Sequence, residues 1–260
     1  MYGEHDVFKT PPDPTIIWRY TTWGRLCDVL AKNALFFARA TVFDDPWEAC
    51  YPEHQYTLES TAEKWAHLVQ GSPETLAHMH EQTLRQLRLF DEGRHENGVS
   101  CWHMAAGESD NHWRIYGRND EGVAIRSTIG KLKLALEACR DRIVYIGGVS
   151  YIDFDTAFVP EGNGFWPIVH KRLAFRHDQE VRAVVWEGER LAVPFGERGV
   201  YVPIDVAALV EEVVLSPLAA PSFVEPVTET IRRFALTCPV RRSELLDPPR
   251  YRSRRTSVSS

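Results

Sequence analysis

The sequence predicts an α+β fold: a single domain in which helices flank a mixed, bent β-sheet and one helical insertion interrupts the strands. At 260 residues, with 44% hydrophobic and 11% aromatic residues, the chain can build one sizeable core. Short β-branched and aromatic runs recur without a regular strand-helix-strand period, which favours a mixed sheet over a parallel one. A charged stretch with helical spacing, residues 57–90, stands between strand-like runs.

The first half opens with a strand, a helix and a second strand. Residues 1–14 carry three prolines and predict an extended lead-in. Thr21 or Thr22 can cap the helix, and Asn33 suits its left-handed end. We expect the domain itself to span residues 15–246. The predicted elements are strand 15–20, helix 23–32, strand 34–40, two helices within 57–90 divided at Gly71, Ser72 and Pro73, strand 98–103, helix 111–116 and strand 122–127.

The second half alternates in the same way without repeating sequence. Gly147 and Gly148 predict a bulge in one strand. The tail, residues 247–260, is rich in arginine and serine and is expected to be disordered. The predicted elements are helix 131–139, strand 142–151, helix 169–175, strand 179–186, an edge strand at 200–203, a brief helix after Asp205, strand 212–215, helix 221–236 and strand 238–242.

Composition limits the class of protein. Five scattered cysteines, without a C-x-x-C pair, favour buried thiols in a reducing compartment over disulfides or a zinc module. There is no signal-like start and no apolar run near the roughly 18 residues that span a bilayer. We therefore expect a cytoplasmic protein without a membrane partner. A net charge of −6 argues against a generic nucleic-acid coat, and no Gly-rich nucleotide-binding motif is present.

Arg19 is the most suggestive early residue, because it lies between Trp18 and Tyr20 in an apolar strand. It could lay its stem on an aromatic ring with its head in water, or face inward and hold a phosphate or carboxylate through two parallel hydrogen bonds. Asp45 and Glu48, with Asp44, crowd a proline turn. They fit a helix start, and they could also form the polar rim of a site that fixes the Arg19 guanidinium.

Aromatic residues gather around the predicted helix 111–116. Trp113 and Tyr116 share one face, so they could stack on a flat ring such as nicotinamide, or simply pack in the core with Trp102. Cys101, His103 and His112 could be imagined as metal ligands, but a fourth ligand is not evident and we predict no metal.

The densest charged stretch runs from Lys171 into a strand that carries Glu180 and Arg182. A solvated sheet face would account for it. The strand becomes apolar at once after these charges, however, so Glu180 is expected at the mouth of the core. A partly desolvated carboxylate beside an arginine is typical of active sites.

These motifs, in this order, resemble the family catalogued as domain of unknown function 2971, over about residues 16–245. Asp44 stands where such proteins usually show an asparagine, and Phe175 and Asp178-Gln179 also depart from the usual pattern. The motifs are Ile17-Trp18-Arg19-Tyr20, Phe43-Asp44-Asp45-Pro46-Trp47-Glu48, Val99-Ser100-Cys101-Trp102, His112-Trp113-Arg114-Ile115-Tyr116-Gly117, Gly122-Val123-Ala124-Ile125, and Lys171 with His177-Asp178-Gln179-Glu180-Val181-Arg182.

The layout also looks like a distant ADP-ribosyltransferase, which by analogy implies NAD as substrate and cofactor. The resemblance would make Glu180 catalytic and would assign Arg19, Tyr20, Trp113 and Tyr116 to NAD. Asp45, Glu48, Trp102, Lys171 and Arg182 would bind substrate or support the site. Arg19 and Glu180 should then open into one cleft. The macromolecular acceptor, protein or nucleic acid, is left open, and a role as a toxin or in phage defence fits such an activity.

Two other functions compete with this one. A non-catalytic module could hold a nucleotide or a phosphorylated partner with the same arginines. A metal-dependent nuclease or hydrolase could use Asp45, Glu48 and Glu180 with a divalent ion.

Overall fold

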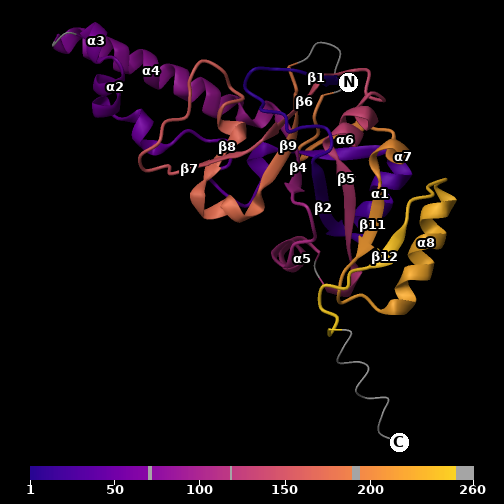
Figure 1. Cartoon of the computed structure of the whole chain (residues 1–260). Helices are drawn as coiled ribbons and strands as arrows, with labels where there is room; N and C mark the ends of the chain where they lie inside the picture. Colours follow the sequence, from indigo (N-terminus) through magenta and orange to yellow (C-terminus); the bar gives the residue numbers. More distant parts are fainter. Residues whose placement is uncertain (70–71, 118, 189–193, 250–260) are drawn as a thin grey trace, which may run out of the picture. The chain divides into compact units, whose positions relative to one another are not determined.

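In the computed structural model of the chain, residues 1–69, 72–117, 119–188 and 194–249 are described. Strands and helices are both abundant and the strands form mixed sheets, so the fold is α+β as predicted (Figure 1). Contacts group the residues into two compact units. The prediction of one domain over residues 15–246 stays a prediction. The predicted tail lies mostly outside the described residues, as does the break at Gly71.

The first unit comprises residues 1–11, 35–101 and 136–203. Its strands run in the order β1, β6, β9, β4, with β3 beside β4 and β10 beside β3. β1 and β6 are parallel, whereas β6 and β9 are antiparallel, and a separate parallel pair is formed by β7 and β8. The strands are β1 (Tyr2–Gly3), β3 (Ala34–Arg39), β4 (Asn97–Met104), β6 (Val144–Gly148), β7 (Ser150–Ile152), β8 (His170–Arg172), β9 (Glu180–Trp186) and β10 (Gly199–Pro203).

Three helices of the first unit confirm that the charged stretch after residue 57 is helical. They are α2 (Leu58–Lys64), α3 (Ala66–Val69) and α4 (Pro73–Gly93). Ser72 caps α4 by accepting a hydrogen bond from the Thr75 backbone N–H, and Pro73 occupies the first turn, where its missing N–H removes no bond. α4 buries Thr83 and Leu87, and Phe90 packs against the same apolar cluster as Leu87.

The second unit comprises residues 12–34, 102–135 and 204–260. β5 lies antiparallel to both β2 and β11, and β12 lies parallel to β11. The last residues of β4 pair with the start of β2. The elements are β2 (Ile16–Thr22), α1 (Trp23–Lys32), α5 (Asp110–Tyr116), β5 (Gly122–Thr128), α6 (Ile129–Leu136), α7 (Val206–Leu209), β11 (Glu212–Leu215), α8 (Val224–Arg233) and β12 (Val240–Arg242).

The predicted helix 23–32 is confirmed in detail. Thr22 caps α1 through its side chain, and Asn33 ends it with φ +46°. Leu26, Val29 and Leu30 form the buried face that the sequence spacing predicts.

Two predicted elements are wrong. Residues 169–175 do not form one α-helix, because β8 begins at His170 and a 3-10 helix follows from Leu173 to Asp178. Residues 142–151 do not form one bulged strand either. The chain leaves β6 after Gly148 and enters β7, which pairs with β8 instead of β9. In both cases pairing between short strands outweighs the local pattern.

No helix of the described chain is apolar over a length sufficient to cross a membrane.

Candidate functional site

A buried arginine organises the start of β9. The Arg182 side chain is 1% exposed, and all three of its nitrogens donate hydrogen bonds. Its Nε and Nη2 meet the two oxygens of Glu180 at 2.9 and 3.1 Å. Its Nη1 donates to Glu48 Oε1 at 2.6 Å and to the Ile168 carbonyl at 2.5 Å. A solvated face for this strand is therefore wrong.

Lys171 lies between two carboxylates at the edge of this cluster. Its Nζ is 2.8 Å from Asp178 Oδ2 and 3.3 Å from Glu180 Oε2. Three further groups fix Glu180: its backbone N–H donates to the Tyr151 hydroxyl at 2.8 Å, its carbonyl accepts from Val149, and its carboxylate accepts from the Cys101 thiol. Glu180 is therefore held at both its backbone and its side chain.

The charge states follow from burial and from these neighbours. Burial alone would raise the pKa of Glu180, but the positive charges of Arg182 and Lys171 outweigh it and lower that pKa from 4.5 to about 2. Burial opposes the charged form of Lys171 as well, yet Glu180 and Asp178 raise its pKa above the ordinary value. Burial and the adjacent Glu180 raise the pKa of Cys101, so its thiol is protonated. Glu180 is an ionised carboxylate in a dry setting.

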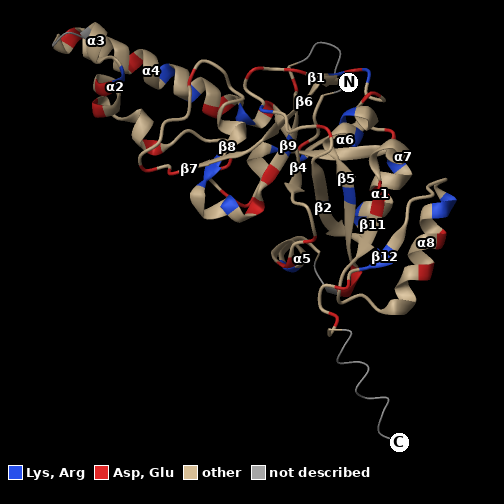
Figure 2. Cartoon of the chain, viewed as in Figure 1, with Lys and Arg blue, Asp and Glu red and all other residues tan. Residues whose placement is uncertain are grey.

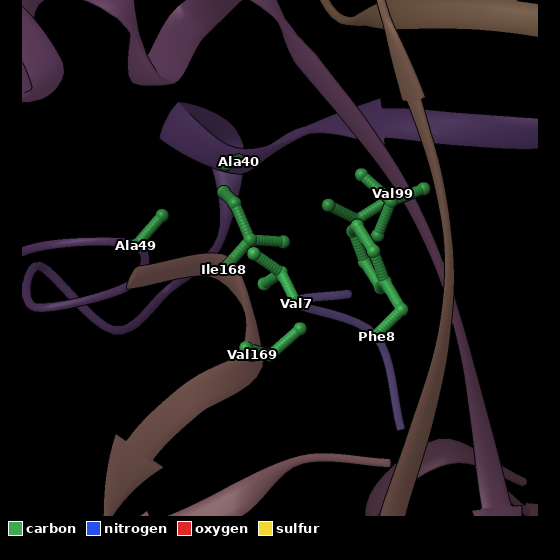
Figure 3. Close-up of a cluster of buried hydrophobic side chains, with 8 residues drawn as sticks. Val7, Phe8, Ala40, Ala49, Val99, Ile168 and Val169 are labelled. Carbon is green, nitrogen blue, oxygen red and sulfur yellow. The ribbon is translucent and has the colours of Figure 1, made fainter. Parts of the chain in front are cut away.

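Both carboxylates that pair with Arg182 adjoin a residue in the left-handed backbone region. Ala49 follows Glu48 with φ +57°, and Gln179 precedes Glu180 with φ +41°. Neither is glycine, so each conformation carries a steric cost that the surrounding packing must offset. Ala49 and Ile168 both belong to a buried apolar cluster of this unit, which also contains Val184 of β9 (Figure 3).

A second arginine-carboxylate pair lies nearby in the chain. Arg172 Nη2 donates to Asp45 Oδ1 at 2.6 Å, and the guanidinium lies over the rings of Trp47 and Phe175. Basic and acidic residues are interspersed around β8 and the 3-10 helix that follows it (Figure 2). Asp45 and Glu48, which the sequence suggested as partners of Arg19, meet Arg172 and Arg182 instead.

The residues predicted to bind NAD lie in the second unit. Arg19 lies over the Trp102 ring at 5.7 Å. Tyr20 and Trp113 are buried in one apolar cluster, where their rings meet edge to face at 4.9 Å. Tyr116, in contrast, is 44% exposed. Trp113 therefore packs in the core, as the alternative interpretation had it, while its predicted role toward NAD stays a prediction.

The imagined metal ligands take other roles. His103 and His112 stack on each other with ring centroids 3.8 Å apart, and the Cys101 thiol donates a hydrogen bond to the Glu180 carboxylate. Among the described residues, no group of three or more His, Cys, Asp or Glu side chains could hold a metal ion.

The structure thus joins four of the predicted site residues in one cluster of the first unit, namely Glu48, Lys171, Glu180 and Arg182. Asp45 lies in the same unit and pairs with Arg172. Arg19, Tyr20, Trp102, Trp113 and Tyr116 lie in the second unit, and the shared cleft of Arg19 and Glu180 stays a prediction. Sequence reasoning missed Cys101, Tyr151 and Asp178 as partners of the cluster. Only Asp178 carried a signal, namely its place two residues before Glu180.

The fold and the cluster define an α+β protein with a buried arginine-carboxylate centre. No protein-family model matches the chain, and no curated protein matches it. A similar solved structure is that of DarT from Thermus sp. 2.9 in complex with carba-NAD+, with a TM-score of 0.36 and 10% sequence identity. The match covers 90% of this chain and 98% of that one.

Proposed function

We propose that the chain is an NAD-dependent ADP-ribosyltransferase in which Glu180 is the catalytic carboxylate. The observation that carries this proposal is the geometry of Glu180: it is buried, and Arg182 orients both of its oxygens through Nε and Nη2. The positive charges of Arg182 and Lys171 lower its pKa, which favours the ionised carboxylate. A fixed negative charge in a dry setting stabilises positive charge that develops nearby far better than the same charge in water would.

The reaction needs such a group. The bond from the ribose C1′ to the nicotinamide nitrogen breaks, and its electron pair returns to the ring, which leaves as neutral nicotinamide. Positive charge builds on the ribose as it takes on oxocarbenium character, and the carboxylate stabilises this transition state more than the ground state. An oxygen or nitrogen of the acceptor then bonds to C1′ and loses its proton. No general acid is required, because the leaving group is cationic before departure.

For a ribose hydroxyl to contact the Glu180 carboxylate, one of the side chains that engages this carboxylate would have to move away from it. A carboxylate offers about four lone-pair positions. Arg182 takes two of them through Nε and Nη2, and the Lys171 ammonium and the Cys101 thiol engage the rest. Lys171 is the group that can leave, since its Nζ is closer to Asp178 than to Glu180. A ribose hydroxyl could then donate to Glu180 while Lys171 stays paired.

Glu180→Gln tests the proposal. Incubated with NAD, the wild type should release nicotinamide, and the variant should lose at least about a hundredfold of that rate, as expected when a charge that stabilises the transition state is removed. Glu187→Gln is the matched control, because Glu187 directly follows β9 and also pairs with an arginine, Arg39. Full turnover in Glu180→Gln would contradict the proposal, provided that both variants show a cooperative unfolding transition.

One observation favours a second candidate, a non-catalytic module that binds nucleotide or phosphate. The oxygens of Glu180 are already engaged by protein groups, as in a structural ion pair. Such a module would bind NAD or ADP-ribose without releasing nicotinamide and without a mass increase on any protein or nucleic-acid target. The acceptor, the cytoplasmic location and the role of Arg19, Tyr20, Trp113 and Tyr116 toward NAD belong to the proposal and stay predictions.

A further inference from the structure

Three of the first-unit arginines that pair with carboxylates, Arg39, Arg172 and Arg182, differ in how many of their donors are used. Arg182 has acceptors at Nε, Nη1 and Nη2. Arg39 is equally satisfied: its Nε donates to the Gly196 carbonyl at 2.9 Å, and its Nη1 and Nη2 donate to Glu187 and to nearby carbonyls. Arg172 is the exception.

Within the described residues, Arg172 has one hydrogen-bond acceptor, Asp45 Oδ1, which its Nη2 reaches at 2.6 Å. Its Nη1 meets no acceptor there, and its Nε is buried without one. A buried donor without an acceptor destabilises a protein, so donors are normally satisfied. The Arg172 side chain is 35% exposed, against 13% for Arg39, so its Nη1, unlike the buried Nε, can be reached from solvent.

Although two of its three nitrogens lack acceptors in the described part of the chain, the Arg172 guanidinium is held in place. Its central carbon lies 5.9 Å from the centroid of the Trp47 ring and 5.3 Å from that of Phe175. Asp45, whose side chain is 7% exposed, supports it from within and is itself fixed by the Trp47 backbone N–H at 3.1 Å. The orientation of the fork is thus set before any ligand arrives, which lowers the entropy lost on binding.

Two further basic residues accompany Arg172 in this stretch of chain. Lys171 Nζ lies 4.7 Å from the Phe175 ring centroid, and Arg176 is exposed one turn further along the 3-10 helix. The planar fork of an arginine fits phosphate and carboxylate oxygens alike. A phosphate group is the better match here, because a diphosphate offers more acceptor oxygens than a carboxylate does to the accessible N–H groups of the fork.

We propose that Arg172, held between Trp47 and Phe175 and backed by Asp45, is the binding site for a phosphate oxyanion. In the setting of the proposed function, which this inference deepens, the group bound is the diphosphate of NAD. The same site would bind free inorganic pyrophosphate. Titration with different ligands distinguishes the diphosphate of NAD from free pyrophosphate.

The test is isothermal titration of the full chain with pyrophosphate, ADP-ribose and nicotinamide riboside, which lacks a diphosphate. Arg172→Lys keeps the charge opposite Asp45 but loses the fork, and it should weaken pyrophosphate and ADP-ribose binding about tenfold, the loss expected for a charge-assisted hydrogen bond. Arg39→Lys is the matched control: Arg39 also pairs with a carboxylate and lies over a ring, that of Phe195, but its donors are filled. It should bind both ligands like the wild type.

Unchanged pyrophosphate affinity in Arg172→Lys, or no binding by the wild type, would overturn the inference. Weakened binding of pyrophosphate and ADP-ribose together supports the diphosphate of NAD as the ligand, and an effect on pyrophosphate alone supports a site for free phosphate. If pyrophosphate binding depends on Arg172 but the chain releases no nicotinamide from NAD, the result supports the phosphate site and contradicts the transferase activity.

Discussion

The charge of Glu180 should control how stability depends on pH. Its pKa in the folded chain lies below that in the unfolded chain, so its ion pairs stabilise the fold fully above about pH 4.5 and progressively less as pH falls toward 2. The difference in unfolding free energy between wild type and Glu180→Gln should therefore shrink between these values. Urea titrations at pH 7, 4.5 and 3 measure it. A constant difference would show that Glu180 gains nothing from Arg182 and Lys171.

Gln179 offers a test of backbone strain beside the site. Its φ is +41°, and its side chain is exposed, so replacement removes little packing. Gln179→Gly should be more stable than Gln179→Ala by about 1 kcal/mol, because only glycine adopts the left-handed region without steric cost. Urea denaturation of the two variants gives the difference. Equal stabilities would mean that the loop relaxes and that no strain is held there.

At the scale of residues, the sequence predicted individual site residues better than it predicted which residues contact them. Glu180 was predictable because it stands immediately before an apolar run, where a carboxylate must be desolvated. Glu48 and Arg182 were each noticed, but 134 positions separate them, and no local spacing reports a contact of that kind. The unfilled donors of Arg172 cannot be seen in a sequence at all.

At the scale of elements, β9 depends on its buried arginine. Arg182→Met should destabilise the chain by about 3–5 kcal/mol, since it leaves the carboxylates of Glu48 and Glu180 buried without their cation. Adding Glu48→Leu and Glu180→Met should return part of that loss, because a fully apolar set needs no charge compensation. Thermal and urea unfolding check both steps. A single variant as stable as wild type would contradict the buried network.

Long elements were predicted well, and short ones were not. The helix after residue 22 has its cap, its apolar face and its left-handed end within one stretch of sequence, so local physics specifies it. β8 has three residues, and its partner β7 lies about twenty positions earlier. Its conformation is set by that pairing, which explains why a helix was wrongly expected there.

At the scale of the whole molecule, each unit is assembled from three separate segments of chain, and these six segments alternate along the sequence. Neither unit can therefore fold from one contiguous piece. A fragment of residues 1–135 lacks β6 and β9 of the first unit and β11 and β12 of the second. It should show no cooperative unfolding by circular dichroism. A sharp transition in that fragment would refute this dependence on distant segments.

The arm formed by α2, α3 and α4 differs from the rest in this respect, because residues 58–93 fall within a single segment of the first unit. Lengthening or replacing the arm changes no strand order and separates no paired strands. A change confined to the described residues of this stretch would leave both the Arg182 centre and the Arg172 pair as they are, because neither takes a side chain from it.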